Sequence, residues 1–493
     1  MTTSTIAFLI ALALATFLTP LVRNAAVRRG WLDYARSIRK VHDQPIPRLG
    51  GIAIVLAFYA PLVGLLLVPS GVGVTFLAAP KYVAGLFVGG IAIALVGIAD
   101  DFHGMGAVKK FSAQFLVAAV MFALGIRIES ITTPWGALAL GDVALPFTMV
   151  WIVGVINAMN LIDGLDGLAS GVAFVAVATN FIIAALSGNV MMMLLMAALG
   201  GAILGFLIYN FNPASIFMGD AGSMFLGFVL ATSSVITSSK SYAAVAMLVP
   251  ILALGLPIMD TFLAMGRRAV RGQPLFSADK EHVHHKLMAL GLSQRKAVVL
   301  LYGVCVFFAA SALAITFANA RQTALILAVV GIISIVFIRK LGYFSILSER
   351  VAKERERNLA LREQVREIGE ALQSAALPGH AWELVQPLGS AMKLSELSLT
   401  LKAISGAGAE EVSRFEWKTT ATDGERMELT LPIESGGKTL GQLQVAWRDG
   451  RRAIERDDEI ALELLRDHLF STAKRMAANA ASAQNIVPLR RAK

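Results

Sequence analysis

The feature that most constrains this chain is a series of eleven long apolar segments in its first 338 residues. An α-helix needs about 20 apolar residues to cross the hydrocarbon core of a bilayer, which is about 30 Å thick. Of the 493 residues, 56% are hydrophobic and 16% are charged, more apolar surface than one water-soluble core can bury. We therefore expect a membrane protein with about eleven spanning helices. The segments cover residues 5–22, 50–68, 82–99, 111–126, 146–160, 168–187, 190–209, 222–239, 243–265, 297–317 and 323–338.

Charge divides the chain near Arg339. Residues 1–338 hold 20 Lys and Arg against 12 Asp and Glu, whereas the rest holds 24 against 22. The first part is apolar and basic, and the tail is charged and nearly balanced. The predicted fold is an all-α polytopic membrane protein followed by a small soluble α+β domain. We place the membrane domain at 1–338, a helical linker at 339–377, the soluble domain at 378–480 and a disordered tail at 481–493.

The tail has its own pattern. Leu361, Val365, Ile368 and Leu372 follow a 4-3-4 spacing, which suits a short coiled coil or a plain amphipathic helix. Four alternating stretches and a closing helix follow, at 394–402, 414–420, 426–433, 439–447 and 457–480. The last strand and helix faintly resemble a GAF-type sensory domain. We expect this domain to serve a homodimer or the docking of other proteins, with small-molecule regulation as the alternative.

The basic residues predict the orientation. Sixteen of the 20 in the membrane part fall in loops on one side, and only Lys81, Arg127, Lys240 and Arg321 fall on the other. Cytoplasmic loops carry such an excess, so we expect the N-terminus outside and the tail in the cytoplasm. No basic residue precedes the first apolar segment, which favours a retained helix over a signal peptide. The net charge of +10 then reflects orientation and phosphate binding, and we expect no nucleic-acid partner.

Five aspartates stand out against this apolar background because they lie at the ends of spans, on the cytoplasmic side, in three different loops. Carboxylates at membrane depth are costly and usually functional. An adjacent pair suits a divalent metal or a general base, and the glycines after the next two acids allow close backbone approach. The fifth acid lies in a Gly-Asp-Ala-Gly-Ser run that opens a helix, where free amides can bind an anion. The five are Asp100, Asp101, Asp163, Asp166 and Asp220.

Two basic loops accompany the acids. His282, His284 and His285 suggest zinc at first sight, but no cysteine or second histidine cluster completes such a site. Phosphate or pyrophosphate binding, together with Arg267 and Arg268, fits the charge better. In the first cytoplasmic loop, Lys40 and Arg48 are expected to hold a lipid phosphate, although a plain positive-inside cluster also explains them.

Together these motifs resemble those of the polyprenyl-phosphate N-acetylhexosamine-1-phosphate transferases, and the resemblance covers residues 1–338. It implies a helical bundle in the bacterial inner membrane, with a cytoplasmic active site. The implied reaction transfers N-acetylhexosamine-1-phosphate from a UDP-sugar to undecaprenyl phosphate, with Mg²⁺ (or Mn²⁺) as cofactor. The products are UMP and an undecaprenyl-pyrophosphoryl-sugar, the first membrane intermediate of a cell-surface polysaccharide. Its partners would be these two substrates and the membrane lipids.

The resemblance also implies roles for individual residues. Asp100 and Asp101 match the family's acidic pair, one of them a base for the lipid phosphate and both near the metal. Asp220 matches a metal-binding aspartate, and Asp163 and Asp166 match carboxylates that bind metal or nucleotide. The remaining matches are substrate-binding residues, namely Lys110, Asn160, Asn210, His282, His284 and His285.

The sugar and the chemical route are less constrained. The His-Val-His-His-Lys-Leu run resembles the branch that starts polysaccharides, so we favour UDP-GlcNAc over UDP-MurNAc-pentapeptide, the substrate of lipid I synthesis. The family often has a third aspartate after the pair, but here His103-Gly104-Met105-Gly106 follows Phe102. Direct attack and a two-step route through an aspartyl-phosphosugar both fit the residues. A transporter is the rival class, although its polar site would lie near the midplane.

Overall fold

A computed structural model describes residues 2–33, 46–67, 71–133, 136–239, 248–270, 282–343, 349–375, 377–404, 410–419, 426–435, 438–451, 454 and 456–484. The chain forms two compact units. One comprises Met1–Arg268 and Pro274–Ser345, and the other comprises Ile346–Lys493 with Ala269–Gln273. The first holds the apolar helices and the second holds the charged tail. The finer boundaries at 338, 377 and 480 stay predictions.

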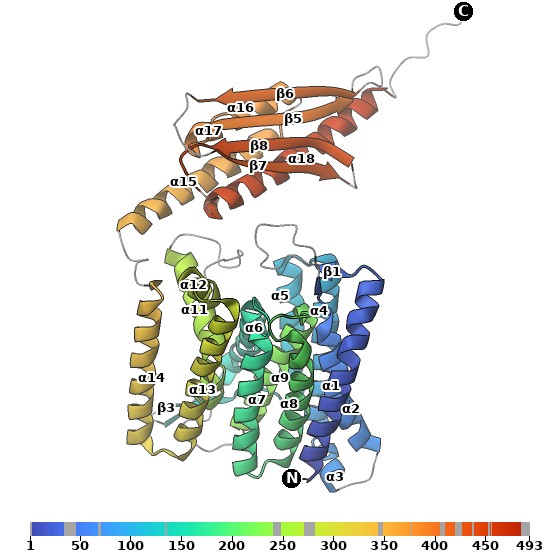
Figure 1. Cartoon of the computed structure of the whole chain (residues 1–493), viewed down its shortest axis with the longest axis vertical. Coiled ribbons are helices and arrows are strands. Elements are labelled where there is room, and N and C mark those ends of the chain that lie inside the picture. The colour runs from blue at the N-terminus through green and yellow to red at the C-terminus, as the bar shows by residue number, and fades with distance from the viewer. Residues whose placement is uncertain are drawn as a thin grey trace, which may run out of the picture. The chain divides into compact units, whose positions relative to one another are not determined.

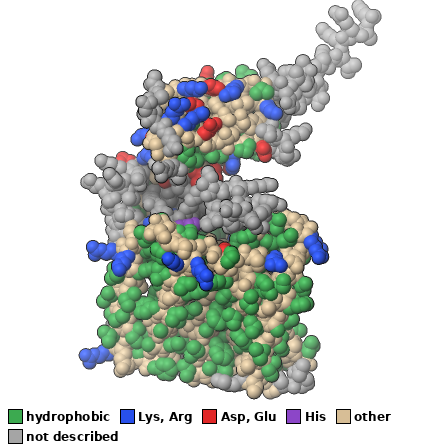
Figure 2. Space-filling view, in the orientation of Figure 1, with side chains coloured by type: hydrophobic (Ala, Val, Ile, Leu, Met, Phe, Trp, Pro, Cys, Tyr) green, Lys and Arg blue, Asp and Glu red, His purple; other side chains and the backbone are tan. Residues whose placement is uncertain are grey.

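The first unit is a bundle of long helices, and its described part has nine that are long and apolar enough to cross a membrane. Hydrophobic side chains cover its flank, and most of the Lys and Arg side chains in view on this unit lie at one end (Figure 2). A multi-pass membrane protein is therefore confirmed. The nine helices (Figure 1) are α1 (Thr2–Arg28), α2 (Gly50–Leu67), α4 (Pro80–His103), α6 (Ala144–Ile162), α7 (Leu168–Leu186), α8 (Val190–Asn210), α9 (Gly219–Ser239), α13 (Gln294–Phe317) and α14 (Ala320–Lys340).

Two of the eleven predicted spans are not among these nine helices. The segment at 111–126 belongs to α5 (Ala107–Ala123), a helix of 17 residues that begins among polar residues. The segment at 243–265 is divided into α10 (Leu248–Ala253) and α11 (Gly255–Val270), and residues 243–247 lie outside the described part. Hydropathy alone merges α10 and α11 because it does not register a break between two apolar stretches.

Short elements complete the first unit. They are β1 (Leu32–Asp33) paired with β2 (Ile46–Pro47), α3 (Gly71–Leu77), β3 (Ser130–Thr133) paired with β4 (Gly136–Ala139), a 3₁₀ turn (Gly141–Val143) and α12 (Val283–Ala289).

Helix α9 lies at the centre of the bundle, and 94% of its apolar window is buried inside the protein, against 11% for α14. The first turn of α2 packs directly against the first turn of α9. A Cβ atom at Gly51 would lie 2.2 Å from the amide nitrogen of Gly222, so only glycine allows this approach. Backbone hydrogen bonds from Gly50 to Phe217 and from Gly51 to Met218 fix the same junction. The Pro-Arg-Leu-Gly-Gly run thus packs the start of α2 against the loop that leads into α9.

The second unit is an α+β domain, as predicted. Its four antiparallel strands are β5 (Glu396–Ile404), β6 (Glu410–Lys418), β7 (Met427–Ser435) and β8 (Lys438–Trp447), in the order β6-β5-β8-β7. The helices are α15 (Glu349–Leu372), α16 (Pro378–Val385), α17 (Leu388–Ala391) and α18 (Arg456–Gln484). Helix α18 continues four residues into the tail predicted as disordered from 481, and residues 485–493 lie outside the described part.

The 4-3-4 seam of the linker helix is buried in the core of the second unit. Leu361, Val365, Ile368 and Leu372 pack with residues of the sheet and of α18. The plain amphipathic helix is therefore the correct alternative, because a coiled coil would need this seam to face a second helix of another chain.

Candidate active site

Predicted site residues from four helices meet at the side chain of Lys110, in the first turn of α5. Its ammonium donates to Asp100 Oδ2, in the last turn of α4, at 2.7 Å and to Asp220 Oδ2, in the first turn of α9. It also lies 3.4 Å from Oδ1 of Asn160 in α6. The side chains of Lys110, Asp100 and Asp220 are 12%, 10% and 27% exposed. One ammonium thus balances two largely buried carboxylates, an arrangement that is stable only while the three charges stay together.

Asp220 is also held through its other carboxylate oxygen. The Asn160 amide donates to Asp220 Oδ1 at 2.8 Å and to the Ser223 hydroxyl at 2.9 Å. Ser223 lies one turn further along α9 and donates to the Gly219 carbonyl. Both oxygens of the Asp220 carboxylate are therefore oriented by hydrogen bonds, and Asn160 joins α6 to the start of α9.

Asp101 serves as a cap for the same helix. Its Oδ1 accepts from the Asp220 amide at 2.9 Å, and its Oδ2 accepts from the Ala221 amide at 3.1 Å. A carboxylate is favoured at a helix N-terminus because it satisfies amides that have no partner within the helix. The amides that we expected to be free for an anion at this helix start are thus occupied by Asp101.

Asp163 differs from the other four acids. It directly follows α6, and within the described part of the chain its carboxylate has no hydrogen-bond partner. Burial, with the nearby charges of Asp220 and Asp101, raises the pKa of Asp163 to about 7, and Arg48 acts in the opposite direction. This carboxylate is therefore the one whose oxygens stay available for a ligand, and its position depends on the backbone that carries it.

Asp166 and Asn210 brace the loop between α8 and α9. Asp166 Oδ2 accepts from the side chain of Asn212 and from the amide of Ala214, both at 3.0 Å. The buried Asn210 accepts from the Ser170 hydroxyl at 2.7 Å and donates to the Ile216 carbonyl at 3.0 Å. Both residues thus position the segment that leads to Asp220, and their binding roles stay predictions.

The loop that carries Asp163 is fixed at its far end by Tyr302 of α13. The Tyr302 hydroxyl donates to the Gly167 carbonyl at 2.6 Å. Its ring lies against α7 where Gly171 has no side chain, since a Cβ there would be 2.1 Å from the ring. Sequence reasoning missed Tyr302 because a tyrosine within an apolar span has no distinguishing local pattern.

The histidine motif is built on a second buried acid. Asp260 of α11 contacts His282 Nδ1 at 2.9 Å and accepts from the Val283 amide at 3.0 Å, which ties α11 to the start of α12. The buried His284 ring packs against Gly164, in the Asp163 loop. Burial, and then the neighbouring His285, lower the pKa of His284 to about 3, so this imidazole is neutral at physiological pH. Sequence reasoning did not assign Asp260 to the site, although a carboxylate near the histidines was a usable signal.

The other predicted basic residues surround the acids less closely. Arg48 is exposed and acts on Asp163 through its charge. Arg267 and Arg268 are buried at the end of α11. Arg267 lies 5.0 Å and the Lys286 ammonium 4.7 Å from the centre of the Tyr343 ring. Lys40 lies outside the described residues.

The donor atoms at this site suit a hard cation. Asp163, Asp220, Asp100 and Asn160 offer only oxygens or an amide, which is the chemistry that Mg²⁺ prefers. Among the residues that the structure describes, no three acids, histidines or cysteines are arranged to hold a metal by themselves. Mg²⁺ commonly binds through one or two carboxylates, with water and substrate phosphates completing its shell. The residues therefore fit a Mg²⁺ ion whose remaining ligands come from outside the protein.

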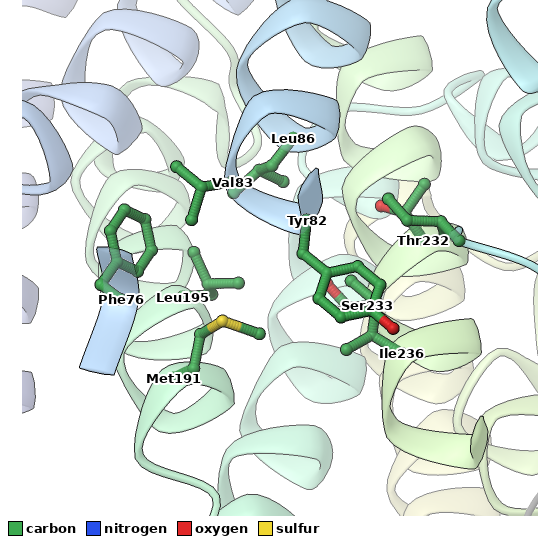
Figure 3. Close-up of a pocket in the computed structure, with 10 residues that line it drawn as sticks. Phe76, Tyr82, Val83, Leu86, Met191, Leu195, Thr232, Ser233 and Ile236 are labelled. Carbon is green, nitrogen blue, oxygen red and sulfur yellow. The ribbon is translucent and has the colours of Figure 1, made fainter. Parts of the chain in front are cut away.

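A small cavity at the opposite ends of α4 and α9 is unrelated to this site (Figure 3). It is lined by Tyr82 near the start of α4 and by Ser233 and Ile236 near the end of α9, with a volume of about 10 Å³. That is room for about one water molecule. The buried Ser233 hydroxyl has no hydrogen-bond partner in the described part of the protein.

Comparison with known proteins decides the family. Residues 83–238, which carry all five aspartates, match the model of "Glycosyl transferase family 4". The chain is 38% identical over 310 residues to the "Probable undecaprenyl-phosphate N-acetylglucosaminyl 1-phosphate transferase" of Bacillus subtilis (strain 168), across 62% of this chain and 84% of that protein. The chain belongs to the polyprenyl-phosphate N-acetylhexosamine-1-phosphate transferases. The resemblance predicted from its motifs is confirmed.

Two further relatives represent two branches of these transferases. The "Decaprenyl-phosphate N-acetylglucosaminephosphotransferase" of Mycolicibacterium smegmatis is 35% identical over 354 residues, across 65% of this chain and 84% of that protein. The "Phospho-N-acetylmuramoyl-pentapeptide-transferase" of Thermoanaerobacter sp. (strain X514) is 40% identical over 169 residues, across 32% of this chain and 54% of that protein. The transferase is thus similar to the first of these relatives over a longer stretch than to the second.

Because Asp101 accepts two hydrogen bonds and Asp163 accepts none from the described residues, substitution of the two residues should affect stability differently. Asp101→Asn places an NH₂ group against a backbone amide and should lower the free energy of unfolding by about 2 kcal/mol. Asp163→Asn breaks no hydrogen bond and should leave thermal unfolding in detergent unchanged. Both should reduce transferase activity by about a hundredfold or more, because each removes a charge from the site. Equal unfolding temperatures for the two variants would contradict the capping role of Asp101.

Removal of the Tyr302 hydroxyl should lower activity selectively, and removal of the Tyr59 hydroxyl is the matched control. Tyr59 donates to the Leu86 carbonyl at 2.7 Å and also packs on a glycine, Gly90, but far from the acids. Tyr302→Phe and Tyr59→Phe should therefore cost similar stability, about 1 kcal/mol each. Only Tyr302→Phe should lower kcat, by about tenfold, because a misplaced reacting group is costly. Equal kcat values for the two variants would show that the Gly167 contact does not position the site.

Proposed function

We propose that this transferase moves GlcNAc-1-phosphate from UDP-GlcNAc to undecaprenyl phosphate, releasing UMP and undecaprenyl-pyrophosphoryl-GlcNAc. The observation that carries the proposal is the cluster of carboxylates around Lys110. Asp163, whose carboxylate has no hydrogen-bond partner among the described residues, lies beside this cluster. The names of the relatives in Bacillus subtilis and in the mycobacteria support the sugar, since each specifies N-acetylglucosamine. A product of this kind is the first membrane intermediate of a cell-surface polysaccharide.

Transfer of phospho-MurNAc-pentapeptide is the second candidate. A relative with that name reaches 40% identity, but the similarity extends over only 32% of this chain and 54% of the relative. The GlcNAc-type relatives cover 62–65% of the chain. The similarity to the GlcNAc-type relatives is the more extensive, so we favour UDP-GlcNAc.

The proposed reaction makes one P–O bond and breaks another. An oxygen of the lipid phosphate attacks the sugar-bearing phosphorus of UDP-GlcNAc, and the bond from that phosphorus to the bridging oxygen breaks as UMP leaves. Both substrates are anions, so positive charge must screen them before they meet. Lys110 and Arg48 supply positive charge on either side of the acids, and Asp163 is placed to accept a proton or to coordinate. Direct attack and a route through an aspartyl-phosphosugar both remain consistent with these contacts.

We propose Mg²⁺ as the cofactor, with Mn²⁺ as its substitute. Asp163 and Asp220 would hold the ion, and Asp100 and Asp101 would lie close by. When bound, the ion supplies charge that stabilises the phosphate oxygens of the transition state. The protein's own part is to orient Asp220 through Asn160 and Lys110 and to cap α9 through Asp101, so that the acids do not rearrange during turnover.

We further propose that the transferase lies in the bacterial inner membrane, with its N-terminus outside. The excess of basic residues in the loops at the site end supports a cytoplasmic active site and a cytoplasmic second unit. Substrates with diphosphate groups would then approach from the side where the basic loops of the first unit lie.

Membranes containing the full-length chain should convert labelled UDP-GlcNAc and undecaprenyl phosphate to lipid-phase label and UMP in equal amounts. Removal of divalent cations with EDTA should stop the reaction, and Mg²⁺ should restore it. UDP-GalNAc and UDP-MurNAc-pentapeptide, tested in parallel, should give little product. Uptake of label into sealed vesicles without lipid labelling would instead support a transporter, and faster turnover of UDP-MurNAc-pentapeptide would support the second candidate.

A further inference from the structure

The sheet of the second unit has two different edges. The strand β7 carries Pro432, which has no N–H, and its register with β8 shifts between Ile433 and Glu434. Proline and bulges are two of the devices that keep another strand from joining a sheet edge, and charged side chains are a third. The β7 edge is therefore closed to a further strand.

The opposite edge has neither a proline nor a bulge. All nine residues of β6 pair with β5 in one continuous antiparallel register, without a shift. The strand contains no proline and no glycine, and within the described residues no strand pairs with its other side (Figure 1). Alternate N–H and C=O groups of an edge strand point away from the sheet and can bond to another strand.

The side chains of β6 separate cleanly between the two faces of the sheet. Phe415 and Trp417 point toward the helices, since Phe415 stacks on Trp382 of α16 and Trp417 packs on the core. The other face presents Val412, which is 54% exposed, and three charged side chains. These are Arg414, Glu416 and Lys418, with exposed fractions of 62%, 41% and 62%.

This pattern suits pairing of β6 with a second β6 in one register. When two copies of β6 pair antiparallel, one residue at the centre lies opposite its own copy. Only three such centres join at least seven of the nine residues and keep Phe415 and Trp417 of both copies on the same face. Centred on Ser413, the pairing opposes Val412 to Arg414 and gives Glu416 no basic partner, and centred on Arg414 it opposes two arginines. Centred on Phe415, it places Arg414 opposite Glu416 at two symmetric positions and Phe415 opposite Phe415, with no like charges in contact.

We propose that two copies of this chain associate through β6, antiparallel and centred on Phe415, to form one continuous eight-stranded sheet. The contact is isologous, as closed dimers require, because each copy offers the same surface. A pairing of seven residues is a small interface. It is sufficient where both copies are confined to one membrane, because confinement raises their effective concentration. The proposal does not depend on the transferase reaction.

Disulfide cross-linking in membranes tests the register. Cys305 is the only cysteine in the chain and is buried in α13, so introduced cysteines react without background. Differently tagged copies with Val412→Cys and Lys418→Cys should form a mixed disulfide on mild oxidation, because these positions face each other. Each variant alone should cross-link at least about tenfold less, because its two cysteines would lie about 20 Å apart. Equal yields for mixed and single samples would overturn the proposal.

Charge reversal in the same cross-linking pair tests the contact itself. Arg414→Glu or Glu416→Arg should each lower the mixed disulfide about fivefold, because each creates two like-charged pairs, and the double reversal should restore it. Glu428→Arg is the matched control. Glu428 lies in β7, the closed edge, is 44% exposed and forms an ion pair with Arg426. This substitution should change nothing. A yield insensitive to Arg414→Glu, or equally sensitive to Glu428→Arg, would contradict the proposed pairing.

Discussion

The ammonium of Lys110 lies between two carboxylates at the end of an apolar bundle, and the rest of the site depends on this balance. Asp100 and Asp220 come from helices that are far apart in the sequence, and neither charge has enough water around it to be stable alone. Because Lys110 contacts both, the end of α4 must meet the starts of α5 and α9. Asn160 adds α6 to the same cluster.

The adjacent residues Asp100 and Asp101 have different roles in this cluster. Asp100 shares the ammonium, whereas Asp101 uses both oxygens on backbone amides of α9. The start of α9 is thereby fixed from outside the helix, and Asp220 in its first turn is fixed with it. Asp163 completes the site as the carboxylate that stays unbonded within the described part of the chain. Its place is set by contacts of its loop with Tyr302 and His284.

Much of this architecture follows from the sequence, for identifiable reasons. Apolar length identifies most spans, and the five aspartates stand out because so few charges surround them. The interpretation fails where a feature depends on tertiary contact. The break between α10 and α11 has no hydropathy signal, and Tyr302 resembles any tyrosine in a span. The amides at the start of α9 looked free because only the fold brings Asp101 to them.

The second unit shows the same limits. Alternation of apolar residues predicts its four strands, yet the order β6-β5-β8-β7 and the difference between its edges come from pairing alone. The seam of α15 has the spacing of a coiled coil, but the domain's own core covers it. Local periodicity reports that a face is buried and does not report which partner buries it.

The most direct measurement of the central claim compares two neighbouring lysines in the same helix turn. Lys109 is exposed, whereas Lys110 bridges the acids. Transfer of label from UDP-GlcNAc to undecaprenyl phosphate should fall by about a hundredfold or more in Lys110→Gln, because two carboxylates lose their counter-charge. It should stay close to wild type in Lys109→Gln. Wild-type turnover in Lys110→Gln, at equal amounts of folded protein, would contradict the account.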